Sequence, residues 1–477
     1  MDAAFHLVTH RSAGGLAASF SQALHYNKNG LLSRRLTSHL LLWTVLPLTA
    51  RAADSYADIV PILEDHCQEC HRKGEIGPMP LTTYREVRPW AKAIRDAVTA
   101  RKMPPWFADP HYGKFANNRS LSHAEIDRLA AWLANGAPEG PTSPTPRSWP
   151  VGWAIGKPDA VARMPHPFRV PGGAEIAYQY FIVPSGFTLD RWVQKAELRP
   201  GDRSVVHHAV VYIREPGSPW LRSMPMGGPV TVPAGSPDAV TKSDILFTYT
   251  PGNGYDEWPQ GTAKLVPAGS DFVFEIHYTP AKQPVFDLSS IGFVFATAPP
   301  IERVLTLQLT NDRLLIPPGH PDYRASVGGT LPNDARLLSL YPHMHLRGKS
   351  FDYAVVEPDG RRTTLLKVDN YDFYWQLNYR LADPLTLLAG TRLECSAVFD
   401  NSKNNPRNPD PEAMVRYGQR SSDEMMIGFF DVAVPANMDK TRFFERRSAD
   451  VPRALRTYPG PFHSGCGWAV PSFCVDD

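Results

Sequence analysis

The chain has 477 residues, of which 43% are hydrophobic, and carries 50 basic against 48 acidic side chains. This length exceeds what one hydrophobic core supports and predicts about three domains, while the balanced charge argues against a nucleic-acid partner. The 47 prolines and 34 glycines favour short strands joined by turns over a mainly helical protein.

Residues 1–53 have the features of a secretory signal peptide. Arg34 and Arg35 precede an apolar run at 40–48 and an A-x-A cleavage site at 50–52. The alternative is an anchor that is never cleaved. No later segment approaches the ~20 apolar residues of a membrane span, so we expect a periplasmic or secreted protein with no transmembrane helix in the mature chain.

The stretch DHCQECHRKG contains Cys67, Cys70 and His71 in a C-x-x-C-H motif. This spacing is typical of covalent haem attachment through two thioethers, with the histidine as an iron ligand. A redox dithiol or half of a zinc site would leave His71 unexplained. The motif therefore predicts haem c.

Helical patterns surround this motif. Apolar residues recur at helical spacing over 82–102, and Ser122 with Glu125 forms a capping box before a helix that closes on Gly136. These patterns predict a small all-α haem domain over residues 54–140.

The sixth iron ligand is expected to be a methionine thioether. Met103 follows the long helical pattern in KMPPW, where two prolines favour an extended loop. Met79 lies too close to the attachment site to reach the opposite iron face easily, and its alternative role is packing against the porphyrin edge. With these features the region resembles class I cytochromes c.

A Pro-rich linker at 141–160 leads into alternating strand patterns. In SVVHHAVVYI the adjacent His207 and His208 would face opposite sides of a regular strand, so they can bind one ion only at a strand end or a bulge. Spacing alone makes one of them a core histidine. In DFVFEIHYTP the alternation places His277 on a polar surface or cleft, opposite an apolar face.

Two segments of the β half are similar in pattern. LVPAGSDFVFEIHY and LLAGTRLECSAVF align at their Ala-Gly turns, which predicts two similar β units. Cys395 then matches Phe274 on the buried face and is expected to be a core thiol.

His343 and His345 stand two residues apart in LYPHMHLRG, so on a strand they point to the same side. Met425 and Met426 follow a polar, turn-rich loop. Two imidazoles with a thioether form a soft ligand set that suits copper. The alternative for the methionine pair is core packing.

Residues 165–440 contain four motifs in the order His-His, His-Tyr, His-x-His and Asp-Glu-Met. With these motifs the region resembles the copper type II, ascorbate-dependent monooxygenases, the family of peptidylglycine alpha-hydroxylating and dopamine beta-monooxygenases. This resemblance implies two all-β jelly-roll sandwiches, at 161–298 and 299–450, before a tail at 451–477. It also implies two separate copper ions. The implied ligands are His207, His208 and His277 for an electron-transfer copper, and His343, His345 and Met425 for the catalytic copper where oxygen is activated.

The resemblance further implies hydroxylation of a C–H bond of a small organic substrate with O2. We expect the fused haem to supply electrons, with an ascorbate-like reductant or another cytochrome as external donor. The peptide-processing family members have an arginine where this chain has Tyr341, so a peptidylglycine substrate is not expected. Cys466 and Cys474 are candidates for a disulfide. The alternative functions are a non-catalytic periplasmic copper and haem electron carrier, a copper-binding protein, and a structural β-sandwich fused to a cytochrome.

Overall fold

The structure is a computed structural model that describes residues 54–443, except 150–151, 174–175, 234–235, 237, 239–243, 280 and 358. The predicted signal peptide and the cysteines at 466 and 474 lie outside these residues. None of the described helices combines the length and apolarity that crossing a membrane requires.

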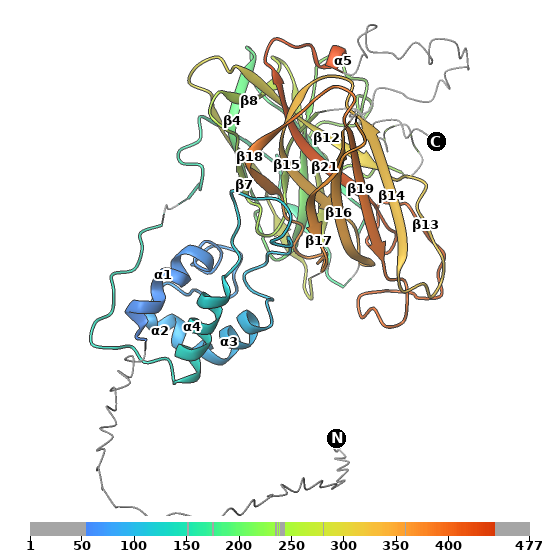
Figure 1. Cartoon of the computed structure of the whole chain (residues 1–477). Coiled ribbons are helices and arrows are strands. Elements are labelled where there is room, and N and C mark those ends of the chain that lie inside the picture. Colours follow the sequence, from blue (N-terminus) through green and yellow to red (C-terminus); the bar gives the residue numbers. More distant parts are fainter. Residues whose placement is uncertain are drawn as a thin grey trace, which may run out of the picture. The chain divides into compact units, whose positions relative to one another are not determined.

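The N-terminal part of the described chain is helical and has its own apolar core (Figure 1). Its elements are α1 (Tyr56–His66), α2 (Tyr84–Val87), the 3-10 helix η1 (Arg88–Trp90), α3 (Ala91–Thr99) and α4 (His123–Ala134). The predicted capping box is confirmed, because Ser122 Oγ accepts from the Glu125 backbone N–H at the start of α4. The predicted helical stretch 82–102 is divided into α2, η1 and α3, with Pro89 inside η1.

The rest of the described chain is mainly β. Its largest sheet has nine strands. They are, in sheet order, β1 (Ala160–Arg163), β11 (Ser290–Phe295), β4 (Arg191–Arg199), β8 (Thr262–Val266), β12 (Glu302–Thr310), β21 (Ile427–Pro435), β15 (Ala335–His343) and β18 (Tyr379–Leu387), with β7 (Tyr255–Glu257) also paired to β4.

Two four-stranded sheets pack against this large sheet. One contains, in order, β3 (Gln179–Pro184), β9 (Asp271–Tyr278), β5 (Val206–Arg214) and β6 (Asp244–Tyr249). The other contains β14 (Tyr323–Thr330), β19 (Arg392–Phe399), β16 (Gly348–Val356) and β17 (Arg362–Val368). The remaining elements are the ribbons β2 (Phe168–Val170) with β10 (Val285–Asp287) and β13 (Leu315–Ile316) with β20 (Val415–Arg416), and the short helix α5 (Lys440–Phe443).

These sheets form two sandwiches, each with its own apolar core. In the first sandwich, strands β4 and β11 share a core with β5, β6 and β9. In the second, strands β12, β15 and β21 share a core with β16, β17 and β19. The sandwiches share one continuous sheet, because β8 and β12 pair in parallel through Thr262 with Glu302. The predicted boundary at residue 298 falls between β11 and β12, but the sheet continues across it.

The internal similarity has a structural counterpart. Strand β9 lies between β3 and β5, and β19 lies between β14 and β16. Phe274 and Cys395 are both 0% exposed and belong to the two cores, so the expectation of a core thiol is confirmed.

The segment between α3 and α4 packs onto the second sandwich, which the predicted boundaries for the helical domain did not anticipate. The Ala116 backbone N–H donates to the Arg380 carbonyl at 2.8 Å, and the Ala382 N–H donates to the Lys114 carbonyl at 2.8 Å. Trp106 contacts Tyr379 edge-on with ring centroids 4.9 Å apart. This segment therefore covers the edge of β18, which would otherwise expose unpaired backbone groups.

Candidate metal centres

A bulge in β5 allows the side chains of His207 and His208 to join the same cluster. Val206 pairs with Tyr278 and His208 pairs with His277, so the register between β5 and β9 shifts at this point. A bulge adds one residue to one strand and re-aims its side chains. The irregularity that two adjacent histidine ligands require is therefore present, although the alternation of side chains alone would have separated them.

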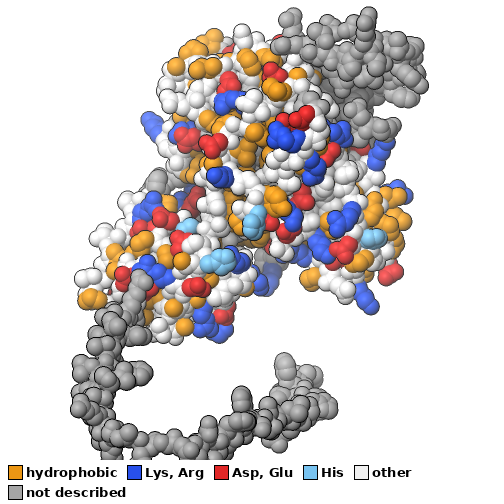
Figure 2. Space-filling view, viewed as in Figure 1, with side chains coloured by type: hydrophobic (Ala, Val, Ile, Leu, Met, Phe, Trp, Pro, Cys, Tyr) orange, Lys and Arg blue, Asp and Glu red, His pale blue; other side chains and the backbone are white. Residues whose placement is uncertain are grey.

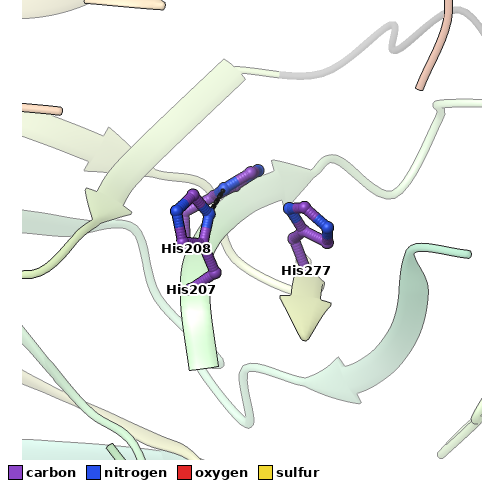
Figure 3. Close-up of side chains that lie close together, drawn as sticks. All are labelled: His207, His208 and His277. Carbon is purple, nitrogen blue, oxygen red and sulfur yellow. Dashed lines mark hydrogen bonds between the residues drawn. The ribbon is translucent and has the colours of Figure 1, made fainter. Parts of the chain in front are cut away.

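His207, His208 and His277 form a buried cluster. One nitrogen from each ring can be chosen so that all three lie within 4.8 Å of one another. Figure 3 shows His277 facing the other two rings from β9, with a dashed line where Nδ1 of His207 lies 3.0 Å from Nδ1 of His208. His277 is only 2% exposed. Burial excludes the predicted polar surface, and the polar face of β9 instead turns this ring toward other imidazoles inside the protein.

The second predicted site gathers at the ends of β15 and β21. The rings of His343 and His345 lie 5.3 Å apart between centroids. His343 pairs with Ile427 in the antiparallel ladder, so continuing that register sets His345 opposite Met425. Met426 is 0% exposed within the core of the second sandwich, whereas Met425 is absent from the described cores. Alternation therefore puts Met425 and Met426 on opposite faces of the strand, with only Met426 in the core.

The two clusters meet, contrary to the expectation of two separate sites. The ring of His208 lies 5.5 Å from that of His343 between centroids. Phe373 stacks on His207 at 4.2 Å and contacts His345 edge-on at 6.3 Å. One aromatic side chain, from the segment that precedes β18, thus contacts a histidine of each cluster.

Several ring nitrogens lack a protein partner. His343 Nδ1 lies 2.6 Å from Gln376 Oε1, a carbonyl oxygen that accepts its proton and leaves Nε2 for another ligand. Among the described residues, Nε2 of His207, Nδ1 of His277 and both nitrogens of His345 have no hydrogen-bond partner, although the Asp423 backbone lies beside the last ring. Buried polar atoms are normally paired, so these nitrogens fit a bound ion.

Burial keeps the clustered imidazoles neutral. It lowers the pKa of His207 and of His343 to about 4. It also lowers the pKa of His208, His277 and His345 well below the usual value, and the neighbouring rings lower it further. A neutral imidazole has the lone pair that a metal ion requires.

These shifts predict an acid-sensitive fold in the metal-free protein. As the pH falls below about 6.5, the histidines become protonated in the unfolded state while they stay neutral in the native state. The free energy of unfolding therefore falls between about pH 6.5 and pH 4. A shift to about 4 corresponds to about 3 kcal/mol for each of His207 and His343. Urea unfolding in the presence of a chelator, with wild type compared to His343→Gln, measures this slope. Equal slopes in the two proteins would contradict the assignment.

Glu424 holds the chain around the second cluster in place. Its Oε2 accepts from the backbone N–H groups of His345 at 2.9 Å and Met425 at 3.2 Å, and its Oε1 accepts from that of Arg347 at 2.6 Å. Arg347 is itself buried and donates to Asn401 and to the Ser422 carbonyl. Burial raises the pKa of Glu424 to about 8, against the lowering effect of these donors. The sequence motif included this glutamate but did not indicate its role.

The C-x-x-C-H motif lies at the C-terminal end of α1. His71 Nδ1 donates to the Met79 carbonyl at 3.1 Å, which orients the ring and leaves Nε2 free. A Cβ on Gly77 would come within 2.7 Å of that imidazole, so only glycine fits there. Cys67 packs against the helical core and Cys70 is partly buried. These features fit a covalently attached haem.

The two candidate sixth ligands differ in their surroundings. Met79 packs partly buried against the helical core, and its backbone carbonyl accepts the bond from His71. Met103 is partly buried beyond the end of α3, and its backbone N–H donates to the Ala97 carbonyl at 3.3 Å. These surroundings do not test which sulfur would bind the iron, and Met103 stays the predicted ligand.

Comparisons with known proteins add little to this picture. No family model matches the chain, and no curated protein matches it. Among solved structures, the major capsid protein P2 of bacteriophage PM2 aligns over 58% of this chain and 98% of its own, at 9% identity and a TM-score of 0.25. The structure of PNGF-II aligns over 58% and 60%, at 10% identity and a TM-score of 0.23. Both likenesses are too weak to carry an argument. The sheets and clusters themselves define a β-sandwich protein with buried histidine sites.

Proposed function

We propose that this protein is a copper-dependent monooxygenase that hydroxylates a C–H bond of a small organic substrate with O2. One observation carries the proposal. Five imidazoles from residues 207–345 are buried together, each at most 6% exposed, and several of their nitrogens have no partner among the described residues. Burying so many unpaired polar atoms is costly unless an ion binds them.

The donor sets favour copper over harder metals. The first cluster offers three neutral nitrogens, and the second offers two nitrogens, with Met425 as the predicted thioether ligand. Copper bound there would supply one-electron redox chemistry and a binding position for O2. The two jelly-roll domains and the periplasmic or secreted location implied by the family resemblance belong to the same proposal.

The residues of this chain would do the positioning. Gln376 fixes the tautomer of His343 through its carbonyl oxygen, and Glu424 fixes the backbone that carries His345 and Met425. Phe373 shields His207 on one ring face. This burial would exclude water from the reaction.

The helical module would supply electrons. Haem would be held by Cys67 and Cys70, with His71 and Met103 as the predicted iron-binding side chains, and would supply one-electron redox chemistry. It would receive electrons from an external donor, either an ascorbate-like reductant or another cytochrome.

A non-catalytic copper and haem electron carrier is the second candidate. The burial of the second predicted site favours this candidate, because His343, His345 and Met425 are all below 9% exposed. A carrier needs no open site, whereas a monooxygenase must open to admit its substrate.

Oxygen consumption separates the two candidates. We expect two coppers per haem iron in the purified protein, and we expect Met425→Leu to lower substrate-dependent oxygen consumption by about tenfold or more, because the thioether favours the reduced ion. Met426→Leu is the matched control, since it makes the same change in the neighbouring core and should retain activity. Full activity of Met425→Leu, or copper binding without oxygen consumption by the wild type with any substrate, would contradict the proposal.

A further inference from the structure

The loop after the C-x-x-C-H motif contains a carboxylate surrounded by three guanidinium groups. Glu75 Oε1 lies 3.3 Å from Arg72 and 3.8 Å from Arg199, and its Oε2 lies 3.1 Å from Arg203. The side chains of Glu75 and Arg203 are only 18% and 20% exposed. Such a half-buried contact is less screened by solvent than a surface pair.

The two ends of this contact adjoin the two predicted redox sites. Glu75 donates its backbone N–H to the carbonyl of Arg72, the residue after His71. Arg203 lies four residues before His207, in the turn that leads into β5. The ion pair therefore joins the haem-attachment loop to the strand that carries the first histidine cluster.

Tyr249 lies beside the same contact. It is 1% exposed on β6, where it pairs with Ala209, the residue after His208. Burial raises the pKa of Tyr249, the nearby Arg203 guanidinium lowers it, and the Glu75 carboxylate raises it. Arg203 and Glu75 are thus both within electrostatic reach of the Tyr249 hydroxyl.

A second tether comes from the Pro-rich linker. Trp149 Nε1 donates to Gln68 Oε1 at 3.1 Å, inside the C-x-x-C-H motif. The guanidinium group of Arg72 lies 4.6 Å above the Trp149 ring. The linker thus packs on the same haem-attachment loop that contains Glu75. The ionic contact between this loop and the turn before β5 is made by Glu75 with Arg203.

We propose that Glu75, through Arg203, docks the haem-attachment loop against the entry to β5 and sets the route by which electrons leave the haem for the first histidine cluster. This inference rests on the proposed function. In each transfer one electron passes from iron(II) to copper(II), which gives iron(III) and copper(I). Glu75 is a positioning residue in this scheme.

Flash reduction of the haem in the copper(II)-loaded protein tests the route, with haem reoxidation followed by absorbance. We expect Glu75→Gln and Arg203→Gln each to slow reoxidation by about tenfold or more, because small displacements along such a contact are costly. The double variant should be no slower than Glu75→Gln alone, since that change already removes the contact with Arg203. Asp96→Asn is the matched control, because Asp96 pairs with Lys92 and Arg95 on its own helix.

A copper-free measurement tests the docking separately. Hydrogen exchange of the haem protein should be faster at residues 70–77 and 203–206 in Glu75→Gln than in wild type, while the haem spectrum and reduction potential stay unchanged. Equal reoxidation rates in wild type and Glu75→Gln would overturn the route, and unchanged exchange would overturn the docking. If wild-type haem is never reoxidised by the loaded copper, the proposed relay itself fails, and faster exchange would still identify Glu75 as a docking residue.

Discussion

Replacing His345 by alanine is expected to lower substrate-dependent oxygen consumption by more than about 100-fold, since even residues that only orient a metal ligand contribute 10–100-fold in such sites. The His345 ring is 0% exposed, and neither of its nitrogens has a hydrogen-bond partner among the described residues. A metal ion bound to His345 would account for the burial of this ring without a hydrogen-bond partner. An oxygen electrode measures the rate, and copper analysis should show the loss of one ion per chain.

His320→Ala provides the matched control, because His320 is exposed and on the same sandwich. It should retain both copper ions and full activity. Removing the His345 ring should leave the metal-free protein folded, since two unpaired buried nitrogens are removed with it. Near wild-type activity of His345→Ala would mean that the second cluster is not the site of oxygen chemistry.

Replacing Glu424 by alanine is expected to lower the free energy of unfolding by about 3 kcal/mol or more, since each buried donor left without its acceptor costs about 1–3 kcal/mol. The change leaves the backbone N–H groups of His345, Arg347 and Met425 without their acceptor. Urea unfolding of the metal-free protein measures the loss.

Two variants make this test specific. Glu424→Gln retains one carbonyl oxygen and should be intermediate in stability. Glu394→Ala removes a half-exposed carboxylate on β19 that pairs with Arg362 and Arg392, so it should change the free energy of unfolding by less than about 1 kcal/mol. If Glu424→Ala and Glu394→Ala are equally stable, Glu424 does not support the second cluster.

The surface gives little indication of these sites. On the face shown in Figure 2, basic and acidic side chains are interspersed. The clustered histidines are buried, and two residues that contact them, Gln376 and Phe373, come from the segment before β18. Gln376 and Phe373 are recognisable only after folding, because their partners lie 33 and 166 residues away in the chain.

The local pattern of residues by itself determined the start of α4 with its capping box, the apolar face of β9, the burial of Cys395 and the candidate ligand types. Each of these depends on neighbours in the chain or on alternation along one strand. Tertiary structure alone decided the bulge at His207, the contact between the two histidine clusters, the support from Glu424 and the docking at Glu75. These features depend on pairing between distant strands and on burial, and no short stretch of sequence encodes either of them.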